Sequence, residues 1–194
     1  MSTPTVLFDA RARLLHWLMA PLLVAMLFIG IGMVSTTSST YALLLAIHKP
    51  LGAAILVLLV LRIHTRLRHR PPPLPFDLPP SQRRAATFSH WLLYALMLAM
   101  PLTGWAMLSA AGHPVTLGAG IVLPPIMPHD AALFAWLRGA HRWLALLLFA
   151  TFLLHLAAAL FHGLVRRDGV LASMASWRRK QASAQTADAS LDNP

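Results

Sequence analysis

Four long apolar runs limit what this chain can fold into. They cover residues 14–34, 41–62, 90–111 and 139–165. A helix needs about 20 mostly apolar residues to cross the hydrocarbon core of a bilayer, which is about 30 Å thick. The 194-residue chain has no glutamate, and its six aspartates all fall outside these runs. The sequence therefore predicts an all-α integral membrane protein, a four-helix bundle in which each run is one span.

The basic residues sort to one side of these spans. Thirteen of the sixteen Lys and Arg residues precede the first run, lie from the last residue of the second run (Arg62) to the start of the third, or follow the fourth. By the positive-inside rule, both termini are expected in the cytoplasm of a bacterium, with the spans in its inner membrane. The first run is too long for a signal-peptide core of about 7 to 15 residues, so it is expected to stay as an anchor. Nucleic-acid binding is not expected, because the basic residues lie at the ends of apolar runs rather than along one polar face.

The rest of the chain reads as connections and a tail. Residues 1–170 are expected to form one transmembrane domain, and residues 171–194 a disordered cytoplasmic tail, small and polar after Lys180. The outer connection, residues 112–136, is apolar but broken by four prolines, so it is expected to lie as a cap at the outer interface. The inner connection carries three consecutive prolines, 71–73, which favour a stiff extended linker.

Cysteine is absent, and this narrows the chemistry. Iron–sulfur clusters, thioether-attached haem, thiolate zinc sites and disulfides are all excluded. A redox metal in this chain has to use histidine, methionine or carboxylate ligands. Ten histidines are available. Five of them are assigned to the membrane-embedded part of the runs, where ionisable residues usually have a function: His16, His48, His90, His141 and His155. The other five are assigned to helix ends or connections.

The depths of these histidines form two levels. In the fourth run, His155 follows His141 by fourteen residues. That separation is about 21 Å along a helix and only about 40° around it, so one helix face carries a histidine at each level. By span direction, His16 lies at the inner level and His48 at the outer level.

Two levels of paired imidazoles match what two stacked b-type haems need. A haem iron is held by axial ligands from opposite sides of a flat disc, hence from different helices. We predict an inner haem between His16 and His155 and an outer haem between His48 and His141. His90 lies at the inner level and is an alternative ligand there, but a contact to the haem edge or to a ligand is favoured for it. A proton relay is disfavoured because such relays usually include carboxylates, which these spans lack.

The sequence resembles the bacterial cytochrome b561 family over residues 10–170, in order. The matching segments are RLLHWL (13–18), IHKPLG (47–52), SHWLLY (89–94), MPLTG (100–104), AHRW (140–143) and HLAAALFH (155–162). The resemblance implies a four-helix dihaem bundle with the same histidine pairs. It also implies one of two activities. Some members are similar to superoxide oxidases that reduce ubiquinone, and others carry electrons for a partner protein.

Two features bear on that choice. The outer basic residues Lys49, Arg138 and Arg142 lie beside the outer ligands, where a positive charge would attract superoxide. Neutralising haem propionates or anchoring at the interface would equally explain them. His162 lies on nearly the same helix face as His155 and is a candidate contact for a quinone head group, with Trp17 and Arg13 as possible neighbours.

We therefore expect a superoxide:quinone oxidoreductase. The alternative is a dihaem carrier between the quinone pool and a periplasmic redox protein that docks on the cap.

Overall fold

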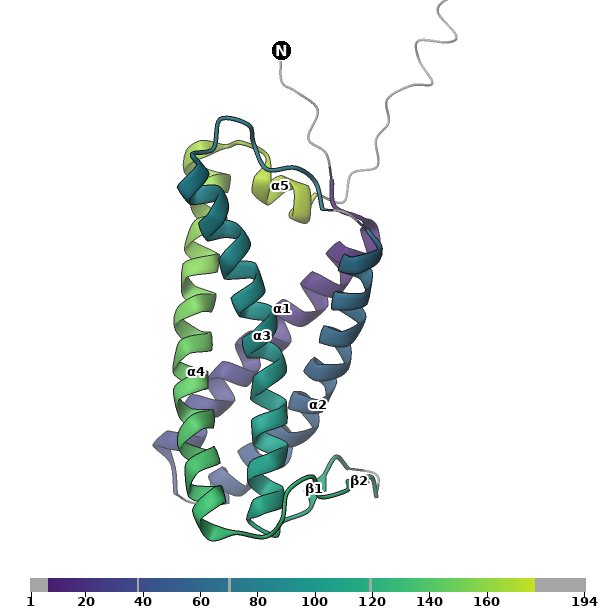
Figure 1. Cartoon of the computed structure of the whole chain (residues 1–194), viewed down its shortest axis with the longest axis vertical. Helices are drawn as coiled ribbons and strands as arrows, with labels where there is room; N and C mark the ends of the chain where they lie inside the picture. The colour runs from purple at the N-terminus through teal and green to yellow at the C-terminus, as the bar shows by residue number, and fades with distance from the viewer. Residues whose placement is uncertain (1–6, 38, 70, 119, 177–194) are drawn as a thin grey trace, which may run out of the picture.

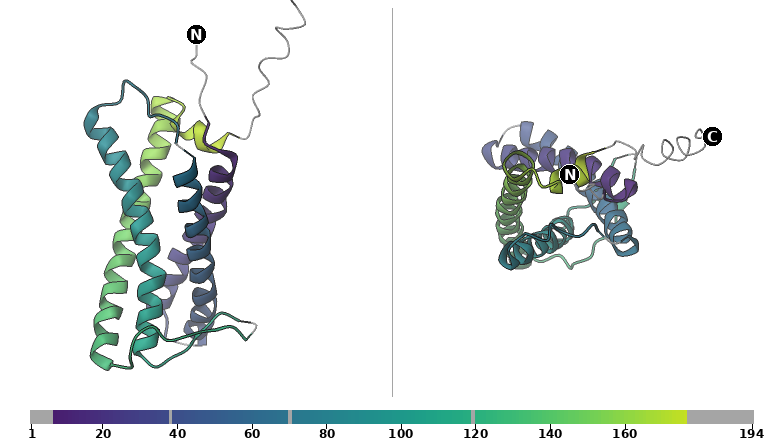
Figure 2. Two further views of the ribbon diagram at one scale, coloured as in Figure 1. Left: turned by 45° about the vertical axis from the view of Figure 1, so that its right-hand side comes forward. Right: turned by 90° about the horizontal axis from the view of Figure 1, so that it is seen from above.

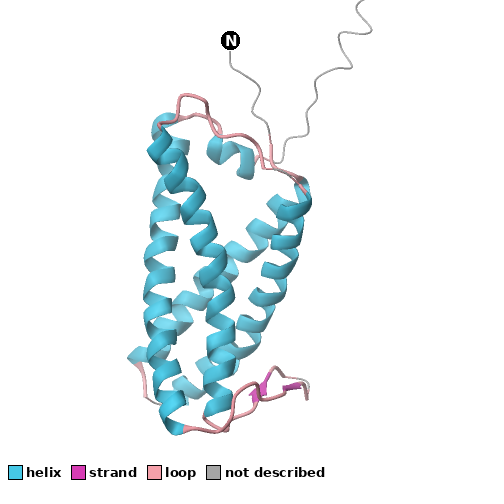
Figure 3. Cartoon of the chain, in the orientation of Figure 1, coloured by secondary structure: helices cyan, strands magenta, loops and turns pink. Residues whose placement is uncertain are grey.

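The computed structural model describes residues 7–37, 39–69, 71–118 and 120–176. Within them the chain forms four long helices, as Figures 1 and 3 show. These are α1 (Ala10–Ser35), α2 (Ser39–Arg68), α3 (Pro80–Ala110) and α4 (Ala131–Leu160). The predicted all-α four-helix bundle is confirmed. All four helices are long and apolar enough to cross a membrane, with α4 taken to Arg166.

The helices are longer than the apolar runs because polar turns extend them. Asp9 caps α1 by accepting a hydrogen bond from the Arg11 N–H at 2.9 Å. Asp130 caps α4 in the same way, accepting from the Leu133 N–H at 2.8 Å. As a result α4 begins eight residues before the predicted residue 139. Helix α3 begins ten residues before the predicted residue 90, with Pro80 in its first turn and no side-chain cap. Trp136 and Arg138 therefore belong to α4 and not to the connection before it.

Three small elements complete the fold. Strands β1 (Val115–Thr116) and β2 (Val122–Leu123) form an antiparallel hairpin in the connection between α3 and α4. The chain continues from α4 into a π-helical turn, η1 (Phe161–Arg166), and then into a short helix, α5 (Val170–Ala175). The hairpin was not predicted, since no periodic signal marks strands of two residues.

The described chain ends meet at one end of the bundle. The Phe8 N–H donates to the Ser173 carbonyl at 3.1 Å. We call this the terminal end, and the opposite end, where β1 and β2 lie, the hairpin end (Figure 1). That the terminal end faces the cytoplasm stays a prediction from the charge distribution.

The predicted disorder from residue 171 is wrong for residues 171–175, which form most of α5. The Trp17 indole N–H donates to the Met174 carbonyl at 3.1 Å, and the Arg13 guanidinium donates to the Ser176 carbonyl. These contacts hold α5 against the start of α1. The remainder of the expected tail, residues 177–194, lies outside the described residues.

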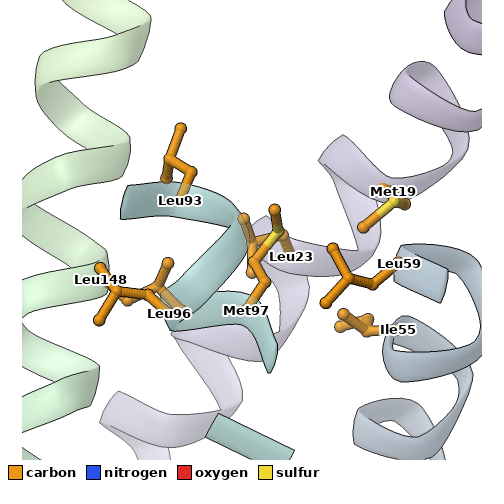
Figure 4. Close-up of a cluster of buried hydrophobic side chains, with 8 residues drawn as sticks. All are labelled: Met19, Leu23, Ile55, Leu59, Leu93, Leu96, Met97 and Leu148. Atoms are coloured by element: carbon orange, nitrogen blue, oxygen red, sulfur yellow. The ribbon is translucent and has the colours of Figure 1, made fainter. Parts of the chain in front are cut away.

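The helices pack as two close pairs, α1 with α2 and α3 with α4, and α2 joins the pairs by contacting α3. Figure 2 shows the four helices end-on. One buried cluster draws on all of them, and Figure 4 shows its members: Met19, Leu23, Ile55, Leu59, Leu93, Leu96, Met97 and Leu148. Large apolar side chains elsewhere on the spans face outward, among them Phe28 and Leu154. An apolar exterior around a small apolar core suits a bundle surrounded by lipid.

Candidate functional site

A pair of histidines lies toward the hairpin end. His48 comes from α2 and His141 from α4, and their ring centroids are 6.3 Å apart with 64° between the ring planes. Both side chains are half-buried. We call these two residues the outer pair.

A second pair lies toward the terminal end. His16 comes from α1 and His155 from α4, and their centroids are 6.4 Å apart with 73° between the planes. We call these the inner pair. His90 of α3 is a third imidazole at this level, with its centroid 5.3 Å from that of His155. The structure thus brings together all five histidines that the sequence singled out, in a group of two and a group of three.

The centroid spacing tests whether each pair fits a haem iron. A bond between a metal and an imidazole nitrogen is about 2 Å long, and the ring centre lies roughly 1 Å further out. Two imidazoles on opposite sides of one iron therefore have centroids about 6 Å apart. The spacings of the inner and outer pairs, 6.4 and 6.3 Å, fit this geometry. The spacing of 5.3 Å between His90 and His155 is shorter, so the geometry favours His16 over His90 as the partner of His155.

A bare metal ion fits these places less well than a haem. Among the described residues, no group of three or more His, Cys, Asp or Glu side chains is placed to hold a metal ion. Each pair offers two ligands, whereas structural ions such as zinc are usually held by about four. A porphyrin brings its own equatorial nitrogens and needs only two axial ligands from the protein.

Two further observations indicate that a bound cofactor belongs between the paired histidine rings. Neither α1 with α4 nor α2 with α4 is a closely packed helix pair in the described chain, although these helices carry the two histidine pairs. His48 also has a buried ring nitrogen, Nδ1, without a hydrogen-bond partner in the described chain. A buried polar atom left in this way is costly and is often a sign of a missing ion or cofactor. The residues present therefore fit a b-type haem.

Thr103 on α3 holds His141 in place. Its Oγ1 atom lies 3.1 Å from His141 Nδ1, and also 2.8 Å from the Ala99 carbonyl. If the Thr103 hydroxyl donates to the backbone, it accepts from Nδ1–H, and this leaves the lone pair of His141 on Nε2, as a metal ligand requires. Gly104 lies beside the same ring, since a Cβ atom there would meet His141 Cε1 at 3.4 Å. Sequence reasoning gave these two residues no role, although they lie in the MPLTG segment.

His162 lies in η1 at the terminal end, and its Nδ1 is 2.6 Å from Asp168 Oδ2. Asp168 also accepts from the Arg166 Nε–H at 3.0 Å and from the Val170 N–H at 3.2 Å. Burial raises the pKa of Asp168, but the hydrogen bonds from His162, Val170 and Arg166 outweigh it and hold the pKa below the ordinary value. Arg166 in turn donates to Asp77 at 2.7 Å. The sequence did not indicate this network.

The residues proposed as neighbours of His162 have other partners. Trp17 and Arg13 donate to backbone carbonyls at and just beyond the end of α5. The outer basic residues also differ from one another. Lys49 is half-buried and donates to Thr116 Oγ1 of β1 at 3.0 Å, whereas Arg138 and Arg142 are exposed one turn apart on α4.

Comparison with known proteins agrees with the resemblance seen in the sequence. A family model described as prokaryotic cytochrome b561 matches residues 7–177. The chain is 33% identical over 133 residues to the probable superoxide oxidase CybB of Yersinia pestis, covering 69% of this chain and 75% of that protein. It is 29% identical to two Escherichia coli proteins. These are cytochrome b561 homolog 2, over 162 residues (82% and 86% of the two chains), and cytochrome b561 homolog 1, over 180 residues (89% and 98%).

Proposed function

The chain belongs to the prokaryotic cytochrome b561 family, which binds b-type haem and transfers electrons in membranes, and from this premise we propose that it passes electrons across the membrane through two haems. The observation that carries the proposal is the spacing of the two histidine pairs, 6.3 Å toward the hairpin end and 6.4 Å toward the terminal end. In a bacterial inner membrane, the basic residues at the terminal end favour the cytoplasm for that end.

The side chains around each pair have separate tasks. His48 and His141 would hold the outer haem, and His16 and His155 would hold the inner one. Bound there, haem would supply one-electron exchange. Thr103 keeps the His141 ring oriented. The buried cluster around Leu59 and Leu148 fills the level between the pairs and keeps water out of it.

We propose superoxide as the electron donor, at the hairpin end. Arg138 and Arg142 are exposed on α4 beside His141, and a positive field there would attract a small anion. The similarity to a probable superoxide oxidase supports this donor. Two superoxide ions would each lose one electron and leave as dioxygen.

We propose ubiquinone as the acceptor, at the terminal end. A quinone takes up two electrons and two protons to become a quinol, so the site needs a group that can supply protons. His162 suits this task because Asp168 accepts from its Nδ1–H, and the imidazolium form of the ring would carry a second N–H, at Nε2, to give to a quinone oxygen.

A carrier role is the second candidate. The hairpin exposes Ile121 and Val122 next to β1, with 56% and 55% of their surfaces accessible, and such an apolar tip suits a protein partner. Stopped-flow mixing of the purified protein with superoxide and a ubiquinone analogue separates the two roles. Haem reduction faster than spontaneous dismutation, followed by quinol formation, supports the oxidase. Its absence supports the carrier.

Haem content across single histidine variants tests the ligands. We expect two haems per wild-type chain, one in His141→Ala and in His16→Ala, and two in His90→Ala. Loss of a haem in His90→Ala would overturn the assignment of the inner pair. A wild-type chain that folds in cells with ample haem and yet is colourless would refute the proposed function.

A further inference from the structure

A small cavity lies at the terminal end, between α2, α3 and the chain ends. Its volume is about 50 Å³, which is room for a few atoms and not for a whole ligand. Its lining includes Arg62, Arg66, His69, His90, Tyr94 and Met174. Two of these are arginines and none is acidic.

The two arginines form one side of the cavity. Arg62 and Arg66 are four residues apart on α2 and therefore neighbours on one helix face. Arg62 Nε donates to the Tyr94 hydroxyl at 3.3 Å, and its guanidinium carbon lies 5.8 Å from the Tyr94 ring centroid. Because the Tyr94 oxygen accepts this bond, its own O–H remains able to donate into the cavity.

No carboxylate balances these charges in the described part of the chain. The ion pairs there join His162 or Arg166 to Asp77 or Asp168, and none includes Arg62 or Arg66. Both arginines are half-buried at the end of a membrane span. A partly desolvated guanidinium is stable when it meets an anion through its planar fork of N–H donors. The cavity is therefore built to receive an anionic group.

The cavity adjoins the inner pair. His90 lines it, and the His90 ring centroid is 5.3 Å from that of His155. The cavity would therefore be a neighbour of a haem held between His16 and His155, and the carboxylate side groups are the anions that such a haem carries.

We propose that Arg62, Arg66 and Tyr94 bind a carboxylate side group of the inner haem. This inference rests on the proposed function, because it requires a haem between His16 and His155. It also gives His90 a place beside the haem edge that needs no bond to iron. The phosphate of an anionic lipid has related chemistry and is the competing occupant that the test must separate.

The test follows haem loss from the full-length holoprotein in detergent to an excess of apomyoglobin, with one kinetic phase for each haem. We expect Arg62→Gln and Arg66→Gln to speed one phase about tenfold or more, the loss expected for a charge-assisted hydrogen bond. The other phase should stay unchanged, which shows that the fold is intact. Arg68→Gln, an exposed arginine on the same helix that does not line the cavity, is the matched control and should change neither phase.

Haem dimethyl ester, whose carboxylates are blocked, provides the second arm. Protein produced in haem-auxotrophic cells supplied with the ester should lose its inner group at the fast rate, and Arg62→Gln should speed it no further. The inference is overturned if the variants keep native haem as firmly as the wild type, or if they speed loss of the ester equally. It is also overturned if wild-type protein stripped of lipid loses its inner haem at the variants' rate and added phosphatidylglycerol alone restores slow loss, since the anion would then be a lipid phosphate. A chain with no haem in any variant would contradict the proposed function itself.

Discussion

The Nδ1 atom of His162 lies 2.6 Å from Oδ2 of Asp168, and this contact ties the π-helical turn η1 to the start of α5. The same carboxylate accepts from Arg166 and from the Val170 N–H, and Arg166 reaches Asp77 in the connection between α2 and α3. One half-buried carboxylate therefore joins three segments at the terminal end. Single π-helical turns often mark functional positions, and here the turn carries the histidine proposed to contact quinone.

The first prediction concerns Asp168 and pH. Burial raises its pKa, yet hydrogen bonds from His162, Val170 and Arg166 lower it overall. A carboxyl whose folded pKa is depressed stabilises the fold fully above its ordinary value of 3.8, and that stability is lost as the pH falls through the lower folded value. We expect hydrogen-exchange protection of residues 161–176 in the full chain to persist at neutral pH and to fall only in acid below that ordinary value.

In Asp168→Asn the same protection should already be reduced about tenfold at neutral pH, because the charge-assisted bonds are lost, and it should vary less with acid. Haem content should not change, since no proposed ligand is involved. Equal protection in the variant and the wild type at neutral pH would show that Asp168 does not anchor α5.

The second prediction concerns the support of His141. Thr103→Val removes the hydroxyl that lies 3.1 Å from His141 Nδ1 while keeping the shape of the side chain. Loss of such a supporting hydrogen bond typically weakens a metal site about 10- to 100-fold. We expect outer haem to be lost to apomyoglobin faster by about that factor.

Thr151→Val is the matched control for Thr103→Val. Thr151 is buried on α4, and its hydroxyl bonds only to the Leu147 carbonyl of the same helix among the described residues. This variant should keep both haems at wild-type rates. Similar losses in the two variants would mean that a buried threonine matters for packing and not for His141.

The third prediction uses Gly104. A Cβ there would lie 3.4 Å from His141 Cε1, so alanine fits closely whereas a branched side chain must push the ring away. We expect Gly104→Ala to keep two haems and Gly104→Val to keep only the inner one. Gly30→Val is the control, because a Cβ at Gly30 on α1 meets nothing within 4 Å. Two haems in Gly104→Val would refute the close approach.

The two histidine levels could be predicted because helix rise and span direction fix depth without any knowledge of packing. At the inner level the sequence favoured His16 but left His90 as an alternative ligand, because the two lie at one depth on different helices. Their spacings from His155, 6.4 and 5.3 Å, favour the same choice. Thr103 was missed because a hydroxyl within a span most often bonds to its own helix, and contact with His141 depends on how α3 packs against α4.

The contacts of Asp168 and Lys49 depend on backbone that leaves the helix. Arg167 and Gly169 have positive φ values, 52° and 81°, and turn the chain so that Asp168 returns to His162. Helical periodicity carries no information about such a reversal. Lys49 was grouped with Arg138 and Arg142 from its place in the sequence, but a hairpin that was not predicted brings Thr116 to it. Sequence patterns thus predicted the positions along the spans better than the contacts at their ends.

The last prediction concerns the attraction of superoxide to the exposed arginines at the hairpin end. Arg138 and Arg142 are exposed and their charges act through water, so replacing both with Gln should slow superoxide-driven haem reduction on the order of tenfold at low ionic strength. At high salt the variant and the wild type should converge, because screening removes the long-range field.

Arg68→Gln with Arg84→Gln makes the same charge change with exposed residues at the terminal end and should have little effect. Lys49→Gln should act differently, since its bond to Thr116 holds the hairpin, and any slowing should not depend on salt. Equal slowing by both double variants would mean that net charge matters and that the outer arginines have no local role.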